Sequence, residues 1–176
     1  MTIHNEHPFA APESERDPVR RFRGRLGGIV SLWTTGTDGS GERPAGLTVS
    51  SFLVAVGEPS RMLALVDPDS DFAEAFQRTE VAVVSLLEWE HQQLADAFAG
   101  QFPAPGGPFR LGAWAPTPWG PRLTTAATWA GVRLRGGSMP DVGWSALADC
   151  VVEHVELGQE TAPLVHRRGR YHKPPG

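Results

Sequence analysis

The longest alternating pattern of apolar and polar residues runs from Arg43 to Pro59, between turn residues. The run is rich in β-branched and aromatic side chains, which predicts one long strand. Neighbouring side chains of a strand point to opposite faces, so the residues divide into two rows. One row holds Leu47, Val49, Ser51, Leu53 and Ala55, and the other holds Thr48, Ser50, Phe52, Val54 and Val56. The hydroxyls of the first half either face solvent as ordinary strand residues or face a ligand as short hydrogen-bond donors.

Shorter apolar runs predict the rest of the fold. Strands are expected at residues 29–35, 61–66, 81–87, 126–135 and 146–157, with one short helix that begins at Asp71 and another at 88–98. This succession of short strands is typical of an antiparallel barrel. We therefore expect a mainly β fold, an antiparallel Greek-key barrel with two short helices. Its core is predicted to contain Leu63, Leu65, Val83, Val132 and Val152.

The chain has 176 residues, a length that suits one domain with a substantial core. Residues 1–19 are polar and have no apolar period, which predicts a flexible N-terminal arm. The remaining residues, 20–176, are expected to form the single domain.

Charge and composition exclude several classes of function. The net charge is −4 and no long basic run is present, which argues against a nucleic acid as partner. No apolar run approaches the roughly 20 residues of a membrane helix, so no membrane association is expected. Cys150 is the single cysteine, which excludes an internal disulfide. The first residues lack the basic-then-apolar pattern of a secretion signal, and we expect a cytoplasmic protein.

Several common catalytic motifs are absent from the sequence. There is no Gly-x-Gly-x-x-Gly turn, no phosphate-binding loop with Gly-Lys-Ser or Gly-Lys-Thr, and no Gly-x-Ser-x-Gly elbow. Metal ligands are not clustered at the spacings of known sites, so no metal centre is expected. Redox chemistry would therefore need a bound organic cofactor, with the protein supplying orientation and electrostatics.

One polar turn stands out after the strand at 61–66. Its sequence is Asp67-Pro68-Asp69-Ser70-Asp71, with carboxylates at alternate positions. A calcium loop of the EF-hand type needs glycine at its sixth position, where Phe72 stands, so calcium is excluded. Asp71 and Glu74 instead fit a capping box at a helix start. The free backbone N–H groups of such a helix end can bind an anion.

Three segments together resemble the flavin reductase family with the FMN-binding split-barrel fold. The first is Gly-Leu-Thr-Val-Ser-Ser-Phe at 46–52, followed by Gly-Glu-Pro at 57–59. The second is Leu-Ala-Asp-Ala-Phe-Ala-Gly at 94–100, and the third is the closing segment around Leu164, His166, Gly169 and Tyr171. The resemblance covers about residues 22–171 and implies an oxidoreductase that binds FMN and transfers hydride to it from a reduced nicotinamide.

The resemblance also implies positions for the flavin, which we state as expectations. Residues of the long strand would line the flavin ring, and the polar turn before the second predicted helix would hold the phosphate. The expected cofactor-binding residues are Thr34, Thr48, Val49, Ser50, Ser51, Asp69, Ser70, Phe98 and Ala99. The nicotinamide or second-substrate side would hold Trp144, His166 and Tyr171.

The sequence departs from the family pattern at two places. Phe72 replaces the threonine of the family's phosphate-binding Ser-x-Thr, and carboxylates flank Ser70. Trp144 stands where many relatives have a histidine associated with the nicotinamide, which predicts slow use of NADH or NADPH.

Assembly and function leave alternatives open at this point. The resemblance implies a homodimer, to which Trp114 and Trp119 are expected to contribute, and a monooxygenase as a partner for the reduced flavin. The alternatives are a non-catalytic flavin-binding module for storage or sensing, and an oxidoreductase that uses a deazaflavin.

Overall fold

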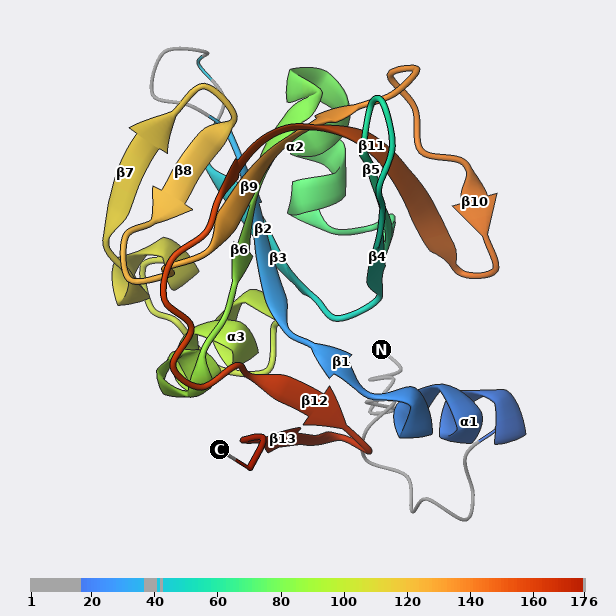
Figure 1. Ribbon diagram of the computed structural model, residues 1–176, viewed down its shortest axis with the longest axis vertical. Coiled ribbons are helices and arrows are strands. Elements are labelled where there is room, and N and C mark those ends of the chain that lie inside the picture. Colours follow the sequence, from blue (N-terminus) through green and yellow to red (C-terminus); the bar gives the residue numbers. More distant parts are fainter. Residues whose placement is uncertain (1–16, 37–40, 42, 176) are drawn as a thin grey trace, which may run out of the picture.

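The computed structural model describes residues 17–36, 41 and 43–175 (Figure 1). In this part of the chain the strands are β1 (Gly28–Ile29), β2 (Ser31–Thr35), β3 (Ala45–Val49), β4 (Phe52–Ala55), β5 (Arg61–Val66), β6 (Val81–Leu86), β7 (Trp114–Thr117), β8 (Gly120–Leu123), β9 (Trp129–Leu134), β10 (Asp141–Val142), β11 (Ser145–Glu156), β12 (Val165–Arg167) and β13 (Arg170–His172). The α-helices are α1 (Pro18–Leu26), α2 (Asp71–Thr79) and α3 (Gln92–Phe98), and two short 3-10 helices are η2 (Trp89–His91) and η3 (Pro108–Leu111).

A large antiparallel sheet forms the body of the molecule. Its strand order is β3-β2-β6-β9-β11-β5-β4, with β10 paired to β11. The sheet curls into a half barrel, and α2 lies in its concave side (Figure 1). The predicted mainly β antiparallel architecture is confirmed.

Helix α1 is an addition to the two predicted helices. Asp17 caps it by accepting hydrogen bonds from the backbone of Val19 and Arg20, and Pro18 occupies its first position. Aspartate followed by proline is a strong helix start because the proline lacks the N–H that would stay unpaired there. The predicted flexible arm at 1–19 therefore overlaps α1 at its end, while residues 1–16 lie outside the described part of the chain.

The predicted strand from Arg43 to Pro59 is two strands. β3 pairs with β2, whereas β4 pairs with β5 at the opposite end of the strand order. One straight strand cannot pair with both ends of a curled sheet, so the chain bends at Ser50 and Ser51. The backbone N–H of Leu65 donates to the carbonyl of Ser51 and fixes the far side of this bend.

The core face of β5 is the opposite of the predicted one. Met62, Ala64 and Val66 are buried, whereas Leu65 is 40% exposed and Leu63 is half-buried. An apolar strand with no alternation carries no information about which row faces inward. Elsewhere the prediction is confirmed for Val83 and Val132, which are fully buried, while Val152 is half-buried.

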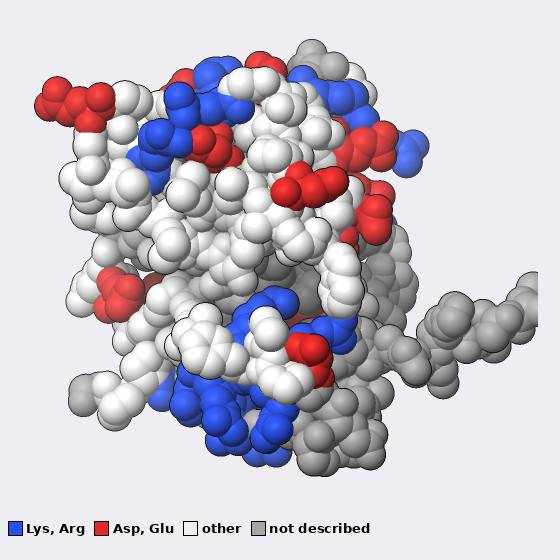
Figure 2. All heavy atoms as spheres, turned by 90° about the vertical axis from the view of Figure 1, so that its right-hand side faces the viewer, with Lys and Arg blue, Asp and Glu red and all other residues white. Residues whose placement is uncertain are grey.

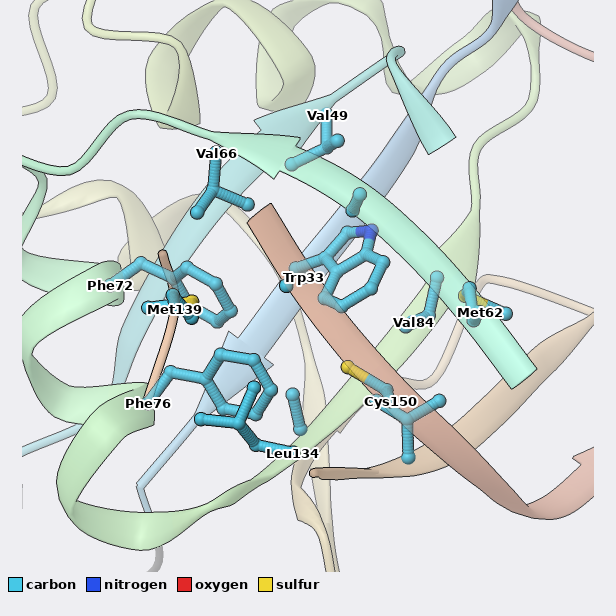
Figure 3. Packing of buried hydrophobic residues seen from close by; sticks show 14 of the residues in the cluster. Trp33, Val49, Met62, Val66, Phe72, Phe76, Val84, Leu134, Met139 and Cys150 are labelled. Atoms are coloured by element: carbon cyan, nitrogen blue, oxygen red, sulfur yellow. The ribbon is translucent and has the colours of Figure 1, made fainter. Parts of the chain in front are cut away.

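Aromatic residues from α2 and β2 fill the half barrel (Figure 3). The Trp33 ring meets the edges of Phe72 and Phe76, with ring centroids 6.4 Å apart in both pairs. The side chain at the position of the family's threonine thus packs in the core. The cap of α2 is Ser70 rather than the predicted Asp71.

A second layer lies at the base of the molecule. The small sheet β1-β12-β13 runs beside α1 there, and α3 packs above it (Figure 1). Among the described helices, none has the length and apolar character that spanning a bilayer requires.

Candidate functional site

The bend between β3 and β4 presents two serine hydroxyls. Ser50 and Ser51 are half-buried, and neither hydroxyl forms a hydrogen bond within the described residues. Val49 beside them is buried, and its carbonyl accepts a hydrogen bond of 2.7 Å from the Ser31 hydroxyl. The bend is thus anchored to the core through its backbone, while its hydroxyls stay available to a ligand.

The small sheet supports this bend from below. Gly28 of β1 lies so close that a Cβ atom would come within 2.8 Å of the Ser50 carbonyl oxygen. Gly28 pairs with His166, and His166 pairs with Tyr171 in the neighbouring strand. Burial and the charge of Arg23 lower the pKa of His166 below its ordinary value. Ser50, His166 and Tyr171, which are far apart in the sequence, therefore belong to one region.

Helix α3 is hydrogen-bonded to both β3 and β13, the two sides of this region. The Tyr171 hydroxyl donates to Oδ1 of Asp96 at 2.6 Å, and the Thr48 hydroxyl donates to the carbonyl of Ala95 at 2.7 Å. Burial, and then the hydrogen bond to Asp96, raise the pKa of Tyr171, which stays protonated at neutral pH. Thr48 and Tyr171 thus position strands through α3.

Thr34, Phe98 and Ala99 do not reach the serine bend. The Thr34 side chain is buried and donates a 2.6 Å hydrogen bond to the carbonyl of Pro121. Phe98 packs on Gly46 so closely that a Cβ atom there would lie 2.6 Å from its ring. Ala99 is exposed at the end of α3. The first two side chains support β3 from behind, within the packed interior.

The polar turn between β5 and α2 forms a second part of the candidate site. The Ser70 hydroxyl accepts from the N–H of Ala73 at 3.1 Å and donates to the carbonyl of Asp67 at 2.6 Å. The backbone N–H of Asp69 donates to the Asp67 carboxylate at 2.9 Å. Asp71 lies in the first turn of α2, where its carboxylate is favoured by the helix dipole.

These contacts make the turn a poor fit for a phosphate. Within the described residues, no Lys or Arg pairs with Asp67, Asp69 or Asp71. The helix end already holds its own carboxylate, and the serine hydroxyl already has two partners. A phosphate dianion would meet repulsion at this turn, whereas Ser50 and Ser51 at the serine bend carry no charge.

The three tryptophans named from the sequence differ in exposure and in packing partners. Trp144 is 86% exposed in the turn before β11, and the guanidinium of Arg20 lies 5.3 Å from its ring centroid. Trp114 is only half-buried and packs against Phe98, with ring centroids 5.9 Å apart. Trp119 stacks on His154 at 5.2 Å. Of these three, Trp144 therefore has the most exposed indole ring.

Basic residues beside the site escaped the sequence analysis. Lys and Arg side chains gather at the lower part of one face, below a recessed uncharged band (Figure 2). They come from α1 and from the β12–β13 hairpin, which are joined by a hydrogen bond from the N–H of Arg168 to the carbonyl of Gly24. The sequence signal was present as spaced arginines at 20–25 and 167–170, but only the fold brings the two groups together.

Comparisons with known proteins agree with this architecture. The model of the flavin reductase like domain matches residues 23–175. The FMN reductase (NADH) RutF of Ancylobacter novellus is 30% identical over 168 residues, which cover 96% of this chain and 90% of that protein. The flavin reductase of styrene monooxygenase from Pseudomonas putida superposes with a TM-score of 0.76 at 19% identity, over 90% of this chain and 98% of that one. An NADH:FAD oxidoreductase from Streptomyces globisporus gives 0.77 at 20% identity, over 92% and 94% of the two chains.

Proposed function

Since the chain belongs to the flavin reductase-like family, we propose that it is a flavin reductase that transfers hydride from a reduced nicotinamide to a flavin. The observation that carries the proposal is the serine bend. The family-like segment at 46–52 folds so that the hydroxyls of Ser50 and Ser51 have no partner within the described residues. FMN, the flavin in the name of the RutF relative, is the flavin proposed here.

A bound flavin supplies the redox chemistry, because it can accept the two electrons of a hydride. The residues of this chain bind and orient. Ser50 and Ser51 would hydrogen-bond polar atoms of the ring, and the backbone of Val49 fixes their position. His166 and Tyr171 border the ring side, while Trp144 provides an aromatic face at the rim. Hydride transfer moves the proton with its electron pair, so no side chain needs to act as an acid or base at this step.

The further parts of the proposal concern assembly and location. We propose that the protein is a cytoplasmic homodimer. Its reduced flavin is transferred to a monooxygenase. Support for the partner comes from proteins of the same fold, which are described as the flavin reductase of styrene monooxygenase and the flavin reductase component of a two-component tryptophan halogenase.

Anaerobic mixing of NADH or NADPH with protein and FMN tests the proposal. Loss of the oxidised flavin absorbance at a rate proportional to protein concentration is expected. Replacing both Ser50 and Ser51 by Ala should weaken flavin binding about tenfold, since it removes two hydrogen bonds. Ser138→Ala, in an exposed turn, is the matched control.

Flavin that binds but is not reduced by either nicotinamide would instead support the storage or sensing module. Reduction of a deazaflavin with no reduction of FMN would support the deazaflavin enzyme. Unchanged flavin affinity in the double serine variant would remove the bend from the site.

A further inference from the structure

A patch of unpaired positive charge adjoins the candidate site in a chain whose net charge is −4. We call it the basic surface, and its members are Arg20, Arg23, Arg25, Arg167, Arg170 and Lys173. All six are exposed, and within the described residues none forms an ion pair with a carboxylate. Like charges that lie close together repel one another, which raises the free energy of the folded protein. Binding of an anion to such a surface lowers this repulsion.

The basic surface is a defined part of the fold. Nε of Arg167 donates to the carbonyl of Arg25 at 3.1 Å, which joins β12 to the last turn of α1. Arg167 and Arg170 are partners in the β12–β13 register. Asp17, which caps α1, and Asp96, which accepts from Tyr171, are the carboxylates nearby, and neither forms an ion pair with a member of the basic surface. Within the described residues, the six cations of the basic surface thus outnumber these two carboxylates.

The position of the basic surface links it to the ring side of the site. Gly28 lies against the Ser50 carbonyl and pairs with His166. The charge of Arg23 contributes to the lowered pKa of His166. Arg20 lies over Trp144 at the rim. A ligand with an aromatic ring at the serine bend or against Trp144 could place an attached anionic group among these arginines.

The two ends of the site have opposite charge, which favours one kind of ligand. The β5–α2 turn is acidic, and the Ser70 hydroxyl there already has two partners. The basic surface, by contrast, carries six exposed cations from α1, β12, β13 and the residue after β13. A pyrophosphate linkage carries two negative charges, and the extra ribose phosphate of NADPH adds more. Exposure of all six side chains suits a ligand that arrives and leaves in each turnover, because surface charge steers association without burying the ligand.

We propose that the basic surface binds the phosphate groups of the pyridine dinucleotide that donates hydride. This inference rests on the proposed function, and it adds a binding site for the part of the donor that does not react. Arg170 and Lys173 are the members chosen for the test, because neither side chain forms a hydrogen bond or an ion pair within the described residues.

The test compares NADH and NADPH with N-benzyl dihydronicotinamide, a hydride donor that has no phosphate. Riboflavin serves as acceptor, so that no flavin phosphate contributes. For the two dinucleotides, Arg170→Glu combined with Lys173→Glu should raise KM about tenfold or more and leave kcat little changed. The benzyl donor should show no change in KM. Arg110→Glu, an exposed cation of η3, is the matched control and should leave all three donors unaffected.

Salt and direct binding give independent readouts. Raising NaCl from about 50 to about 200 mM should raise KM for the dinucleotides several-fold and spare the benzyl donor, because the salt screens exposed charges. Calorimetric titration should show that NADP⁺ binds the wild-type protein and binds the double variant at least about tenfold more weakly.

The outcomes separate this inference from the proposed function. Equal KM increases for the dinucleotides and the benzyl donor, or NADP⁺ affinity that is the same in wild type and double variant, would overturn the basic surface as a phosphate site. Failure of every donor to reduce flavin would overturn the proposed function, and the NADP⁺ titration would then decide the inference alone.

Discussion

At the scale of single residues, the turn between β5 and α2 decides how the site treats a phosphate. Asp69 and Asp71 flank Ser70 and have no cationic partner in the described part of the chain. Two unit charges 4 Å apart interact by about 1 kcal/mol in water, so each carboxylate can cost a bound phosphate dianion a comparable amount. We expect FMN to bind no more tightly than riboflavin. Replacing both Asp69 and Asp71 by Asn should strengthen FMN binding by about three- to tenfold and leave riboflavin unchanged.

Fluorescence titration of both flavins measures this preference, and Glu160→Gln, in the exposed segment before β12, controls for the loss of negative charge. Tight FMN binding that depends on Ser70, with riboflavin far weaker, would restore Ser70 as the phosphate ligand and contradict the prediction.

At the scale of elements, His91 holds the start of α3, on which Thr48 and Tyr171 depend. Its Nδ1 accepts from the N–H of Glu88 at 2.9 Å, so the neutral ring must carry its proton on Nε2, which donates to the Thr125 hydroxyl at 3.0 Å. A second proton would face the Glu88 N–H. Burial lowers the pKa of His91 below its ordinary value of 6.5, although Glu90 and Glu88 oppose the shift.

The pH dependence follows from that direction. A depressed pKa means that the folded state binds the proton less readily than the unfolded chain. The contribution to stability is therefore complete above pH 6.5 and is lost as the pH falls through the lowered pKa. Denaturant unfolding between pH 8 and about pH 5 should show falling stability, and His91→Gln should flatten that fall. His172→Gln, at an exposed position, should keep the wild-type slope. An unchanged slope in the His91 variant would show that this ring does not govern the acid response.

The same scale shows what the sequence could and could not predict. The main strand and helix positions followed from apolar periods and turn residues, because these signals are local, although the cap of α2 was placed one residue too late. The bend at Ser50 and Ser51 was not predictable from the local sequence. It exists because β3 and β4 pair with opposite ends of the strand order. β5 is apolar throughout, so its pattern could not show that Leu65 faces outward. The basic surface likewise depends on a contact between α1 and the β12–β13 hairpin.

At the scale of the whole molecule, β4 is an exposed edge of the large sheet. It ends the strand order, and Leu53 and Val54 are 73% and 56% exposed. Leu65 of the neighbouring strand is 40% exposed and lies on the same face of the sheet as Leu53, whereas Val54 lies on the other face. An open edge strand with apolar side chains favours pairing with another chain, which proteins otherwise prevent with charges or proline. The half-buried Trp114 and Trp119 are less suited to carry the interface than this edge.

We therefore predict an isologous homodimer that forms through β4, because one patch then meets the same patch of a second copy. Sedimentation at micromolar concentration should give twice the 19.0 kDa of one chain. Replacing Leu53 by Lys and Val54 by Glu should shift the protein to the single-chain mass, with less than about 1 kcal/mol lost from the stability of the monomer fold, since both side chains are exposed. Leu157→Lys, at a position that is 80% exposed outside β4, should leave the dimer intact. A wild-type protein that sediments as one chain, or a dimer that survives the paired substitution, would place the assembly surface elsewhere and leave β4 an uncovered edge.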